Sequence, residues 1–567
     1  MKSFCEVTNR NELADFLRIR KSTLTYVLYV RQVDNLYNSF TIPKKDGSLR
    51  QISSPHVVLK KIQKKLANAL WEYQLTIWKK RNIHPNMSHA FEKHKSIITN
   101  ATIHKNKRFI LNLDLENYFD SFHFGRVKGY FEKNNNFLLP TSVATILAQL
   151  TCYRGTLPQG APTSPIITNM ICQILDNRLL KIAKKYKADY TRYADDLTFS
   201  TNRRDFLEDY SDFYRDITRE IENAGFKIND KKQRLFFKDS KQIVTGLVVN
   251  DRVNIDHIYY KKTRAMAHRL YTTGQYDLNG SAGTIEQLEG RFSFINCLDH
   301  YNNRLNNAGY GLDKLNGRER EYQKFLFYKY LYAHNMPLII TEGKTDILLL
   351  TAALKKMYTE YPNLIIKVDD NTAFWLNISF LHRSQRLHYF LGMSQDGADA
   401  MQSIYKFFID DNKDRKRYPN YASYFYNICQ HKPLNPVFLL YDNEMCSKNK
   451  PLYKFVNSQK ISDDQRKNLQ HDLYLELIKD RNIFLLTLPL LGEAKECEIE
   501  DLIDEAILET IIDGKSFSRN SEFDTTRFYG KEIFSRYVAS HYNEINFDNF
   551  KPLFNAIDEV IRYYHSS

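Results

Sequence analysis

Two adjacent carboxylates, Asp195 and Asp196, lie between β-prone segments at residues 190–193 and 197–200 of a basic chain. Tyrosine, leucine and phenylalanine in these arms suit a half-buried strand, so the pattern predicts a hairpin with both acids at its tip. Neighbouring carboxylates raise each other's pKa unless a cation or hydrogen bonds intervene, which favours a divalent metal site. The alternative is a solvated polar turn.

A third carboxylate has an equally distinctive setting. Residues 108–113 predict a short apolar strand that ends on Asp114 and is followed by acids and two aromatic residues. A strand end beside a hairpin tip is the geometry required for two metal ions roughly 3.5–4 Å apart in nucleotidyl transfer. Asp114, Asp195 and Asp196 are therefore the candidate catalytic residues, with Mg²⁺ as the expected cofactor.

These acids give the chain a resemblance to reverse transcriptases. Asp114 matches the first catalytic aspartate of that family's palm, and residues 193–196, Tyr-Ala-Asp-Asp, match its Tyr-x-Asp-Asp box. The resemblance implies that two Mg²⁺ ions bind at this site and that Phe119 is the aromatic gate that excludes a ribose 2′-OH. Residues 157–165 match the segment that supports the template and the incoming nucleotide.

Further residues are candidates for nucleotide binding. Residues 40–55 predict a hairpin with a tight Asp-Gly turn, flanked by Lys44 and Arg50. Arg50 can hold phosphate with a two-pronged donor group, whereas the alternative is a solvated hairpin. The resemblance favours a fingers hairpin that contacts the nucleotide, and it adds Gln159, Gly160 and Lys232. Lys232 would lie near the leaving phosphate, or alternatively be a surface lysine.

Two short motifs narrow the resemblance to retron reverse transcriptases. Asn100 and His104 belong to an Asn-Ala-x-x-His signature, and Val244, Thr245 and Gly246 match a Val-Thr-Gly signature. Both occur in the expected order around the polymerase palm. The resemblance implies that these residues bind RNA. The alternative for His104 is a packed or exposed histidine without a functional role.

The length and the net charge of the chain limit the classes of protein to which it can belong. The 567 residues allow three or four domains, each large enough to bury a core. A net charge of +15 favours a polyanionic partner. The basic runs, such as 60–61, 64–65 and 79–81, are spread along the chain. Each run alone is typical of a solvated helix face, and only their sum indicates nucleic acid.

The seven cysteines are scattered and include no Cys-x-x-Cys pair. This pattern favours reduced thiols over a disulfide framework or a zinc site. The N-terminus lacks an apolar signal core, and no run reaches the roughly 18 apolar residues that a membrane helix needs. We therefore expect a soluble, cytoplasmic protein with no membrane partner.

The C-terminal part of the chain carries a second acidic pattern. Residues 338–341 predict a buried strand with Glu342 at its carboxyl end, followed by a glycine turn and a helix. Residues 436–441 predict another buried strand, which ends in Asp442 and Glu444. Ligands collect at such strand ends in open α/β sheets, and carboxylates there suit Mg²⁺.

This second pattern resembles a Toprim domain, the catalytic module of topoisomerases, primases and some nucleases. Glu342 and Asp346 match its first motif, and Asp442-x-Glu444 matches its Asp-x-Asp motif with one departure. The resemblance implies Glu342 as general acid/base and Asp346, Asp442 and Glu444 as ligands of Mg²⁺ or Mn²⁺. Glutamate reaches one methylene further than aspartate, which leaves the activity open. The acidic run 498–504 is interpreted as a solvated helix start, with a metal ligand as the alternative.

The predicted fold is an α+β polymerase right hand followed by an α/β, Rossmann-like Toprim domain with a mostly parallel sheet. The expected parts are N-terminal helices and fingers at 1–110, a palm at 111–240, a helical thumb at 241–333, and the Toprim-like domain with a C-terminal helical extension at 334–567.

This order of parts resembles retron reverse transcriptases with a fused Toprim effector. The resemblance implies an RNA-directed DNA polymerase that uses dNTPs to copy its own noncoding RNA (msr-msd) into branched, RNA-linked single-stranded DNA (msDNA). It also implies a toxic, nuclease-like effector with a nucleic-acid target in anti-phage defence. Two alternatives remain: another retroelement reverse transcriptase with a primase- or topoisomerase-like domain, or a non-catalytic scaffold. A homo-oligomer is compatible with either.

Overall fold

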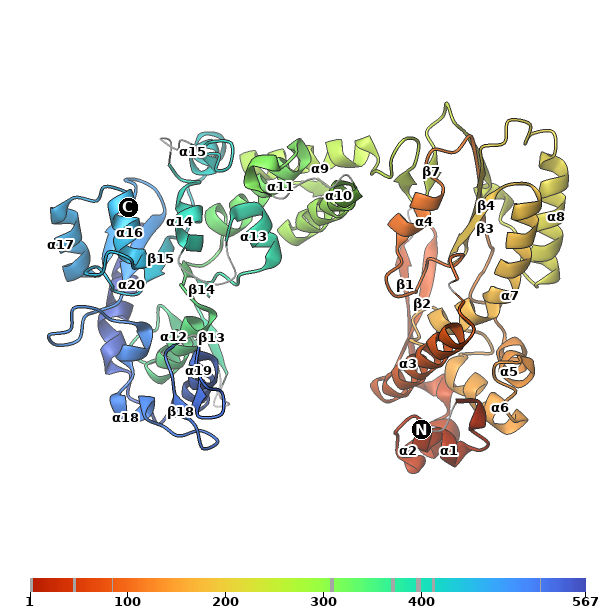
Figure 1. The fold of residues 1–567 in the computed structure, drawn as a ribbon, viewed down its shortest axis with the longest axis horizontal. Coiled ribbons are helices and arrows are strands. Elements are labelled where there is room, and N and C mark those ends of the chain that lie inside the picture. Colours follow the sequence, from red (N-terminus) through yellow and green to blue (C-terminus); the bar gives the residue numbers. More distant parts are fainter. Residues whose placement is uncertain are drawn as a thin grey trace. The chain divides into compact units, whose positions relative to one another are not determined.

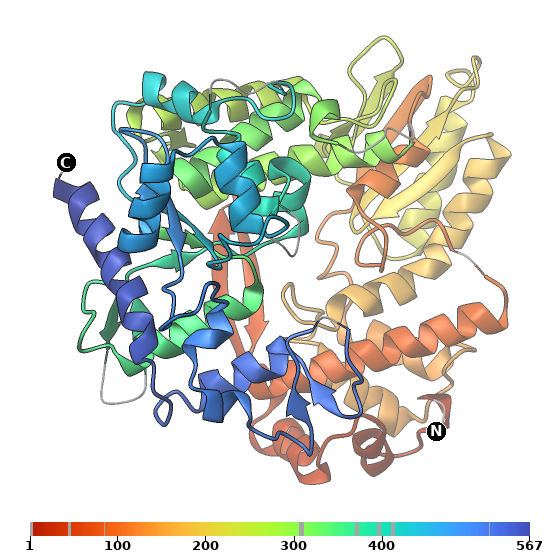
Figure 2. The same ribbon diagram turned by 60° about the vertical axis from the view of Figure 1, so that its left-hand side comes forward.

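The computed structural model describes residues 4–43, 47–83, 85–305, 311–368, 373–393, 399–409, 414–520 and 522–566. The chain forms two compact units, Met1–His257 and Ile258–Ser567, each of which is described by itself (Figures 1 and 2). Within the described ranges, none of the helices combines the length and the hydrophobicity required to traverse a lipid bilayer.

A four-stranded antiparallel sheet organises the first unit, with the strand order β4-β5-β3-β6. The hairpin predicted from residues 190–200 is confirmed as β4 and β5. The central strand β3 is buried at every position except Asn112, which is half-buried. The strands are β3 (Phe109–Asp114), β4 (Asp189–Tyr193), β5 (Asp196–Thr201) and β6 (Arg234–Phe237).

Helices cover both faces of this sheet. Figure 1 shows α7 (Ser164–Lys185) and α8 (Tyr210–Asn223) beside one face, and α4 (Ile97–Ile103) beside the other. The hairpin of β7 (Ile243–Val244) and β8 (Leu247–Val248) packs against α4. The remaining helices of the unit are α1 (Arg10–Phe16), α2 (Lys21–Thr25), α3 (Val57–Lys80), α5 (Phe124–Lys133) and α6 (Thr141–Thr151), with short turns at Phe4–Glu6, Tyr26–Val30, Val33–Leu36 and Asp230–Lys232.

A second hairpin, β1 (Tyr37–Pro43) and β2 (Leu49–Pro55), confirms the predicted strands at residues 40–55. Its outer half is exposed, and its inner end is buried near Ser53. There the Ser53 amide donates a hydrogen bond to the Gln159 carbonyl at 2.7 Å. The hairpin is thus attached at its base to the loop that follows α6.

The second unit contains a five-stranded sheet of order β14-β11-β15-β17-β16. The first four strands are parallel, and β16 is antiparallel to β17, so the mostly parallel sheet predicted from the sequence is confirmed. Every residue of β11, β15 and β17 is buried. The strands are β11 (Leu338–Ile340), β14 (Ser379–Phe380), β15 (Val437–Tyr441), β16 (Tyr474–Glu476) and β17 (Ile483–Thr487).

Alternate residues of this sheet enter different cores, as the period of two along a strand requires. Phe438 and Leu440 face a core shared with α12 (Lys344–Lys356), α19 (Lys531–Ser540) and α20 (Lys551–Ser566). Val437 and Leu439 face the other core. Helices of that second core include α13 (Gln385–Leu391), α14 (Asp399–Tyr405), α15 (Tyr421–Ile428) and α16 (Pro451–Ser458).

The helices expected to form a thumb pack into this second unit. They are α9 (His257–Thr273), α10 (Ile285–Leu305) and α11 (Gly317–Phe327). Phe292 and Phe325 belong to the same hydrophobic core as Leu439 of the parallel sheet. No change of core therefore occurs at the predicted boundary between 333 and 334, and the thumb assignment stays a proposal.

Smaller elements complete the second unit. They are β9 (Asp277–Leu278), β10 (Ser281–Ala282), β12 (Ile365–Lys367), β13 (Phe374–Leu376), α17 (Asp463–Asp472), α18 (Glu505–Leu508), β18 (Ser516–Phe517), β19 (Phe528–Tyr529), and turns at Leu312–Lys314, Tyr328–Tyr332, Ile499–Leu502 and Asp548–Phe550.

Candidate active sites

The sheet of the first unit brings the three predicted catalytic aspartates together. Strand pairing places Asp114, the last residue of β3, opposite Asp196, the first residue of β5. The Leu115 amide donates to the Asp195 carbonyl at 3.0 Å, which joins the strand end to the hairpin tip. The structure therefore has the convergence that the sequence pattern predicts.

Electrostatics in this acidic cluster oppose full ionisation. Burial raises the pKa of Asp195, and the charge of Asp114 adds to the rise. Asp196 reaches the solvent of an open cleft, yet the surrounding protein excludes enough water to raise its pKa. Together with the charges of Asp195 and Asp114, this desolvation raises the pKa of Asp196 to about 7. A positively charged ligand would relieve this repulsion.

Lys232 is the closest cation to this cluster among the described contacts. Its Nζ lies 3.0 Å from both carboxylate oxygens of Asp114, and the Asn229 side chain donates to the same carboxylate at 3.2 Å. Burial would lower the pKa of Lys232, but its contacts with Asp114 outweigh this and raise it. Lys232 is therefore a charged donor within the site rather than a remote surface lysine.

A buried ion pair supports the hairpin tip from below. Arg192 of β4 and Asp176 of α7 are almost inaccessible and form two parallel hydrogen bonds of 2.8 Å. The Arg192 guanidinium also donates to the carbonyl of Ala194 at 3.3 Å. Ala194 has a φ of 56°, an unfavourable left-handed conformation for alanine. Sequence reasoning missed this pair, which holds the turn between the two strands.

A cleft of about 450 Å³ opens beside the acids, which lies in the range of small-molecule sites. Asp114 and Asp196 form one part of its wall, and Thr245 and Gly246 of the predicted Val-Thr-Gly signature form another. The Asn112 side chain donates to the Ile243 carbonyl at 2.7 Å and so ties the signature hairpin to β3. Val244 is fully buried and does not reach the cleft.

The other signature residues lie inside the protein. His104 is fully buried, and its two ring nitrogens lie 2.7 Å from the hydroxyls of Ser200 and Thr191. Burial lowers its pKa to about 3, so the ring is neutral. Asn100 is 1% exposed. The His104 ring fastens the end of α4 to β4 and β5, and any contribution of His104 or Asn100 to RNA binding would act through the position of α4.

The other predicted nucleotide-binding residues differ in their surroundings. Arg50 of β2 is exposed, and its charge partly offsets the raised pKa of Asp195. Phe119 is partly buried, with its ring edge-on to Tyr118 at a centroid distance of 5.3 Å. Lys44 falls outside the described residues.

The loop at Gln159 and Gly160 has a backbone role. Gly160 has a φ of 121°, and a Cβ at this position would lie 2.6 Å from the Ser53 carbonyl oxygen. Only glycine allows this approach. With the hydrogen bond from Ser53 to the Gln159 carbonyl, it fixes the base of the β1–β2 hairpin against the loop.

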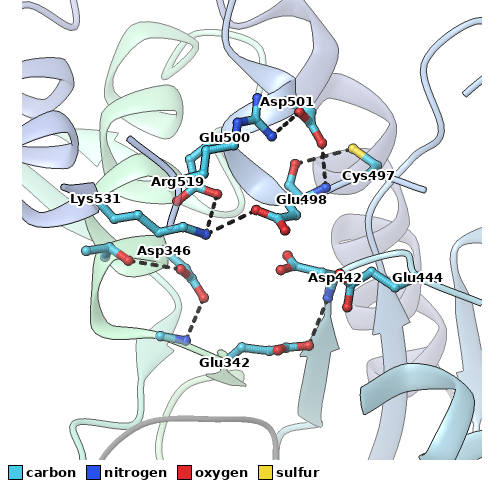
Figure 3. A network of polar contacts seen from close by, with 12 residues as sticks. Glu342, Asp346, Asp442, Glu444, Cys497, Glu498, Glu500, Asp501, Arg519 and Lys531 are labelled. Atoms are coloured by element: carbon cyan, nitrogen blue, oxygen red, sulfur yellow. Dashed lines mark hydrogen bonds and ion pairs between the residues drawn. The ribbon is translucent and has the colours of Figure 1, made fainter. Parts of the chain in front are cut away.

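The second acidic cluster lies at the carboxyl ends of two adjacent parallel strands (Figure 3). Glu342 follows β11 and accepts a hydrogen bond of 3.2 Å from the Asp442 amide, which follows β15. After β11 the chain forms β14 on one side before β15 pairs on the other. Glu342 and Asp442 thus flank the point where strand order reverses, the usual ligand site of open α/β sheets.

The other two predicted ligands are close but already engaged. Asp346 accepts a hydrogen bond of 2.8 Å from the Gly343 amide and so caps α12. Glu444 is 4% exposed and forms an ion pair with Lys450. All four predicted acids therefore lie around one strand-end region.

Burial dominates the electrostatics of this cluster. It raises the pKa of Glu342 to about 7, with further contributions from Glu444 and Asp346. Burial, and then the charge of Glu500, raises the pKa of Asp346 to about 6. Burial, and then the charge of Glu342, holds the pKa of Asp442 well above its ordinary value. The cluster has an excess of negative charge that favours a cation.

Glu500 and Lys531 also belong to this region (Figure 3). Glu500 is 1% exposed, so the interpretation of the acidic run as a solvated helix start is wrong for this residue. Lys531 of α19 lies 3.0 Å from Glu500 and 3.2 Å from Glu498. The acidic composition of residues 498–504 is typical of a solvated segment. The burial of Glu500 could not be predicted from it, because the ion pair depends on Lys531, which lies far along the chain.

Divalent cations suit both acidic clusters chemically. Among the residues that the structure describes, no three His, Cys, Asp or Glu side chains stand in a ready-made coordination arrangement. Both clusters nevertheless offer carboxylate oxygens, the ligands that Mg²⁺ prefers. Burial, and then repulsion between the acids, raises the pKa values of Asp196 and Glu342, and a cation would relieve that repulsion. The candidate ligands are Asp114, Asp195 and Asp196 in the first unit, and Glu342, Asp346, Asp442 and Glu444 in the second.

Comparison with known protein families identifies the general class of this chain. The family model "Reverse transcriptase (RNA-dependent DNA polymerase)" matches residues 42–264, which include the first acidic cluster. The structure of apo telomerase from Candida tropicalis aligns with a TM-score of 0.30 and 14% identity over 51% of this chain and 60% of that chain, and this similarity is too low to bear on the fold.

Two curated relatives define the family. Retron Ec86 reverse transcriptase of Escherichia coli is 34% identical over 306 residues, which cover 53% of this chain and 87% of that protein. Retron Mx162 reverse transcriptase of Myxococcus xanthus is 33% identical, over 52% of this chain and 64% of that protein. The chain belongs to the retron reverse transcriptases and is an RNA-directed DNA polymerase that uses an RNA template and dNTPs.

Proposed function

We propose that this polymerase copies its own structured noncoding RNA, msr-msd, into branched, RNA-linked msDNA. Asp114, Asp195 and Asp196 are the proposed catalytic residues. The observation that supports this assignment is their convergence at one end of the β3–β5 pair, beside a cleft and next to Lys232. The retron family supports the substrate.

The proposed roles follow from chemistry and position. Asp114 and Asp195 would hold two Mg²⁺ ions, with Asp196 assisting, and the bound ions would supply charge that stabilises the attacking and leaving oxygens. Lys232 would donate a hydrogen bond to the leaving phosphate. Arg50 would bind the triphosphate through its guanidinium.

Replacement of two acids tests this assignment. The Asp195→Asn/Asp196→Asn variant should lose complementary DNA synthesis while it retains RNA binding, because asparagine keeps the shape but not the charge. Asp239→Asn/Asp251→Asn, which changes two exposed acids outside the cleft, is the matched control. Extension at the wild-type rate by the first variant would contradict the proposal.

We further propose that residues 334–567 form a Toprim-like nuclease that acts as a toxic effector in anti-phage defence. The position of Glu342 and Asp442 at the reversal of strand order supports a catalytic site there. Glu342, with a pKa near neutrality, suits a general acid/base. Asp346, Asp442 and Glu444 would hold Mg²⁺ or Mn²⁺, which would supply Lewis-acid chemistry for phosphodiester cleavage.

A nuclease assay separates this proposal from a non-catalytic scaffold. Purified full-length protein is incubated with Mg²⁺ or Mn²⁺ and with single- or double-stranded DNA or RNA. Glu342→Gln should abolish cleavage and toxicity, whereas Glu505→Gln, at an exposed acid of α18, should not. Absence of cleavage by the wild-type protein, or unchanged toxicity of Glu342→Gln, would favour the scaffold.

A further inference from the structure

One face of α3 is an exposed row of cations. Leu59, Ile62, Leu66 and Leu70 recur at helical spacing and pack into the core of the first unit. The opposite face carries a single acid, Glu72. The exposed cations of this face are Lys60, Lys61, Lys64, Lys65 and Lys79, and Lys80 and the C-cap Arg81 extend the basic surface around the end of the helix. We call this surface the α3 basic face.

These cations differ from those on helix α8. Across the described parts of the chain, no ion pair involves Lys60, Lys61 or Lys64, and Lys65 donates to the Arg18 carbonyl. On α8, by contrast, Arg215 lies 2.8 Å from Asp212 on the same helix. A helix face adapted only to water commonly alternates the two signs at such spacings.

The scarcity of acids on this face has an energetic consequence. Lys60 and Lys64, and likewise Lys61 and Lys65, are four residues apart and lie one above the other on the helix. Like charges at this spacing destabilise a helix. The face is therefore under repulsion that a polyanion would relieve, and the opposite, apolar face alone keeps the helix in place.

The distribution of the cations indicates the form of the polyanion. One cluster, residues 60–65, and another, residues 79–81, are separated by about 14 residues, which is roughly 21 Å along a helix. α3 extends as one long helix (Figure 1), so the two clusters are held apart rigidly. Such a rigid, extended set of cations matches regularly spaced phosphates rather than a small anion.

The aromatic residues of α3 argue against a single strand. Trp71 and Tyr73 are partly buried against the core, and Trp78 is also only partly exposed. Proteins that bind single strands stack bases on exposed aromatic rings. Duplex RNA is instead recognised by its shape and through its phosphates and 2′-hydroxyls. The α3 basic face offers phosphate contacts without a stacking surface.

We infer that the α3 basic face binds the phosphate backbone of a double-stranded stem of the RNA that this chain copies. This inference rests on the proposed function, because it takes the bound RNA to be the template that the polymerase copies. Neutralisation of phosphates releases counterions, so binding at this face should be strongly dependent on salt.

Binding to a simple hairpin tests the inference. The probe is a fluorescently labelled RNA hairpin with a fully paired stem, titrated with full-length protein over a series of salt concentrations. Lys60→Gln/Lys61→Gln/Lys64→Gln should weaken binding at least about ten-fold and reduce the slope of log K against log salt by about 2–3. Lys79→Gln/Lys80→Gln/Arg81→Gln should have a similar effect from the other cluster.

The matched control removes the same charge elsewhere. Lys21 and Lys467 are exposed, Lys551 is partly exposed, and all three pair with acids. The Lys21→Gln/Lys467→Gln/Lys551→Gln variant should bind the hairpin within about two-fold of wild type. Equal losses in this control and in the α3 variants would show a non-specific charge effect and overturn the inference. Equal losses for the hairpin and for an unpaired RNA of the same length would overturn stem recognition.

Failure of this inference is distinguishable from failure of the proposed function. Primer extension on an unstructured RNA template with a DNA primer reports the polymerase alone. Wild-type extension together with unchanged hairpin binding by both α3 variants would overturn the inference and leave the polymerase intact. Loss of hairpin binding with extension retained at saturating template is the expected result.

Discussion

The two acidic clusters assemble their carboxylates differently. In the first unit, an antiparallel hairpin carries Asp195 and Asp196, and the buried Arg192–Asp176 pair holds that hairpin from behind. In the second unit, acids follow separate parallel strands, and the lysines that contact them are partly exposed. Both clusters have a partly exposed lysine beside an acid, Lys232 in the first and Lys450 in the second. The first cluster differs in the buried ion pair that lies behind its turn.

This difference indicates which substitutions should disrupt each acidic cluster. A buried ion pair behind a turn fixes geometry without touching a substrate, whereas an accessible lysine beside carboxylates balances charge and can be displaced by a cation. We expect changes to the support to affect folding most, and changes to the countercharges to affect stability less and metal dependence more.

The largest effect is expected from Arg192→Met. It leaves Asp176 buried without its partner, which should destabilise β4 and β5 by about 3–5 kcal/mol. Native-state hydrogen exchange of these strands measures the change. Arg203→Met, at an arginine that pairs with Asp205 near the surface, should have a much smaller effect. Equal effects of the two substitutions would contradict the supporting role of Arg192.

A smaller but catalytic effect is expected from Gly160→Ala. The new Cβ would collide with the Ser53 carbonyl and shift the β1–β2 hairpin relative to the acids. A displacement of this kind should lower kcat/KM for dNTP incorporation roughly 10–100-fold. Gly129→Ala is the control, because a Cβ there meets open space within α5. Activity of Gly160→Ala at the level of the control would show that the hairpin base tolerates movement.

In the second unit, Lys531→Met tests the countercharge. It leaves Glu500 buried without its cation, and because Lys531 is 35% exposed we expect a loss of about 1–2 kcal/mol. Hydrogen exchange of α12 and α19 is the measurement, and primer extension should be unchanged. Lys344→Gln removes an exposed pair with Glu532 and should change little. A loss in Lys531→Met as large as in Arg192→Met would erase the distinction between the two sites.

The smallest effect concerns pH. The folded protein holds Asp196 and Glu342 at pKa values of about 7, above their unfolded values of about 3.9 and 4.3. The stability that these carboxyls contribute is therefore complete below about pH 4 and is lost as the pH rises through 7. Asp196→Asn and Glu342→Gln should match wild type at pH 4 and be slightly more stable at pH 8, by less than about 1 kcal/mol.

Denaturation without divalent cations at the two pH values provides the measurement. Addition of Mg²⁺ should reverse the order, since a cation bound to the native carboxylates stabilises wild type more than the variants. Greater stability of the variants at pH 4 than at pH 8, relative to wild type, would show that the pKa shifts have the opposite sign.

The sequence predicts the placement of acids wherever a local pattern sets it. Asp114 ends a run of apolar residues, and Asp195 and Asp196 occupy a turn between two β-prone arms, so their meeting follows from strand pairing. Glu342 and Asp442 follow equally clear buried strands. In each case burial and hydrogen bonding along a few consecutive residues determine where the side chain lies.

The sequence does not predict features that depend on distant partners. Arg192 is a charged residue in a strand, and only the fold shows that Asp176 neutralises it inside the protein. His104 belongs to a functional signature, yet Thr191 and Ser200 bury it. Glu500 lies in an acidic run that is typical of a solvated surface. In the fold it is buried and forms an ion pair with Lys531.

Helices α9 to α11 share an apolar interior with the parallel sheet, as Phe292, Phe325 and Leu439 show. Cleavage of the chain near residue 333 would leave complementary apolar surfaces on both fragments, and we expect such fragments to aggregate. Proteolysis at this position is therefore a poor route to an independently folded C-terminal fragment.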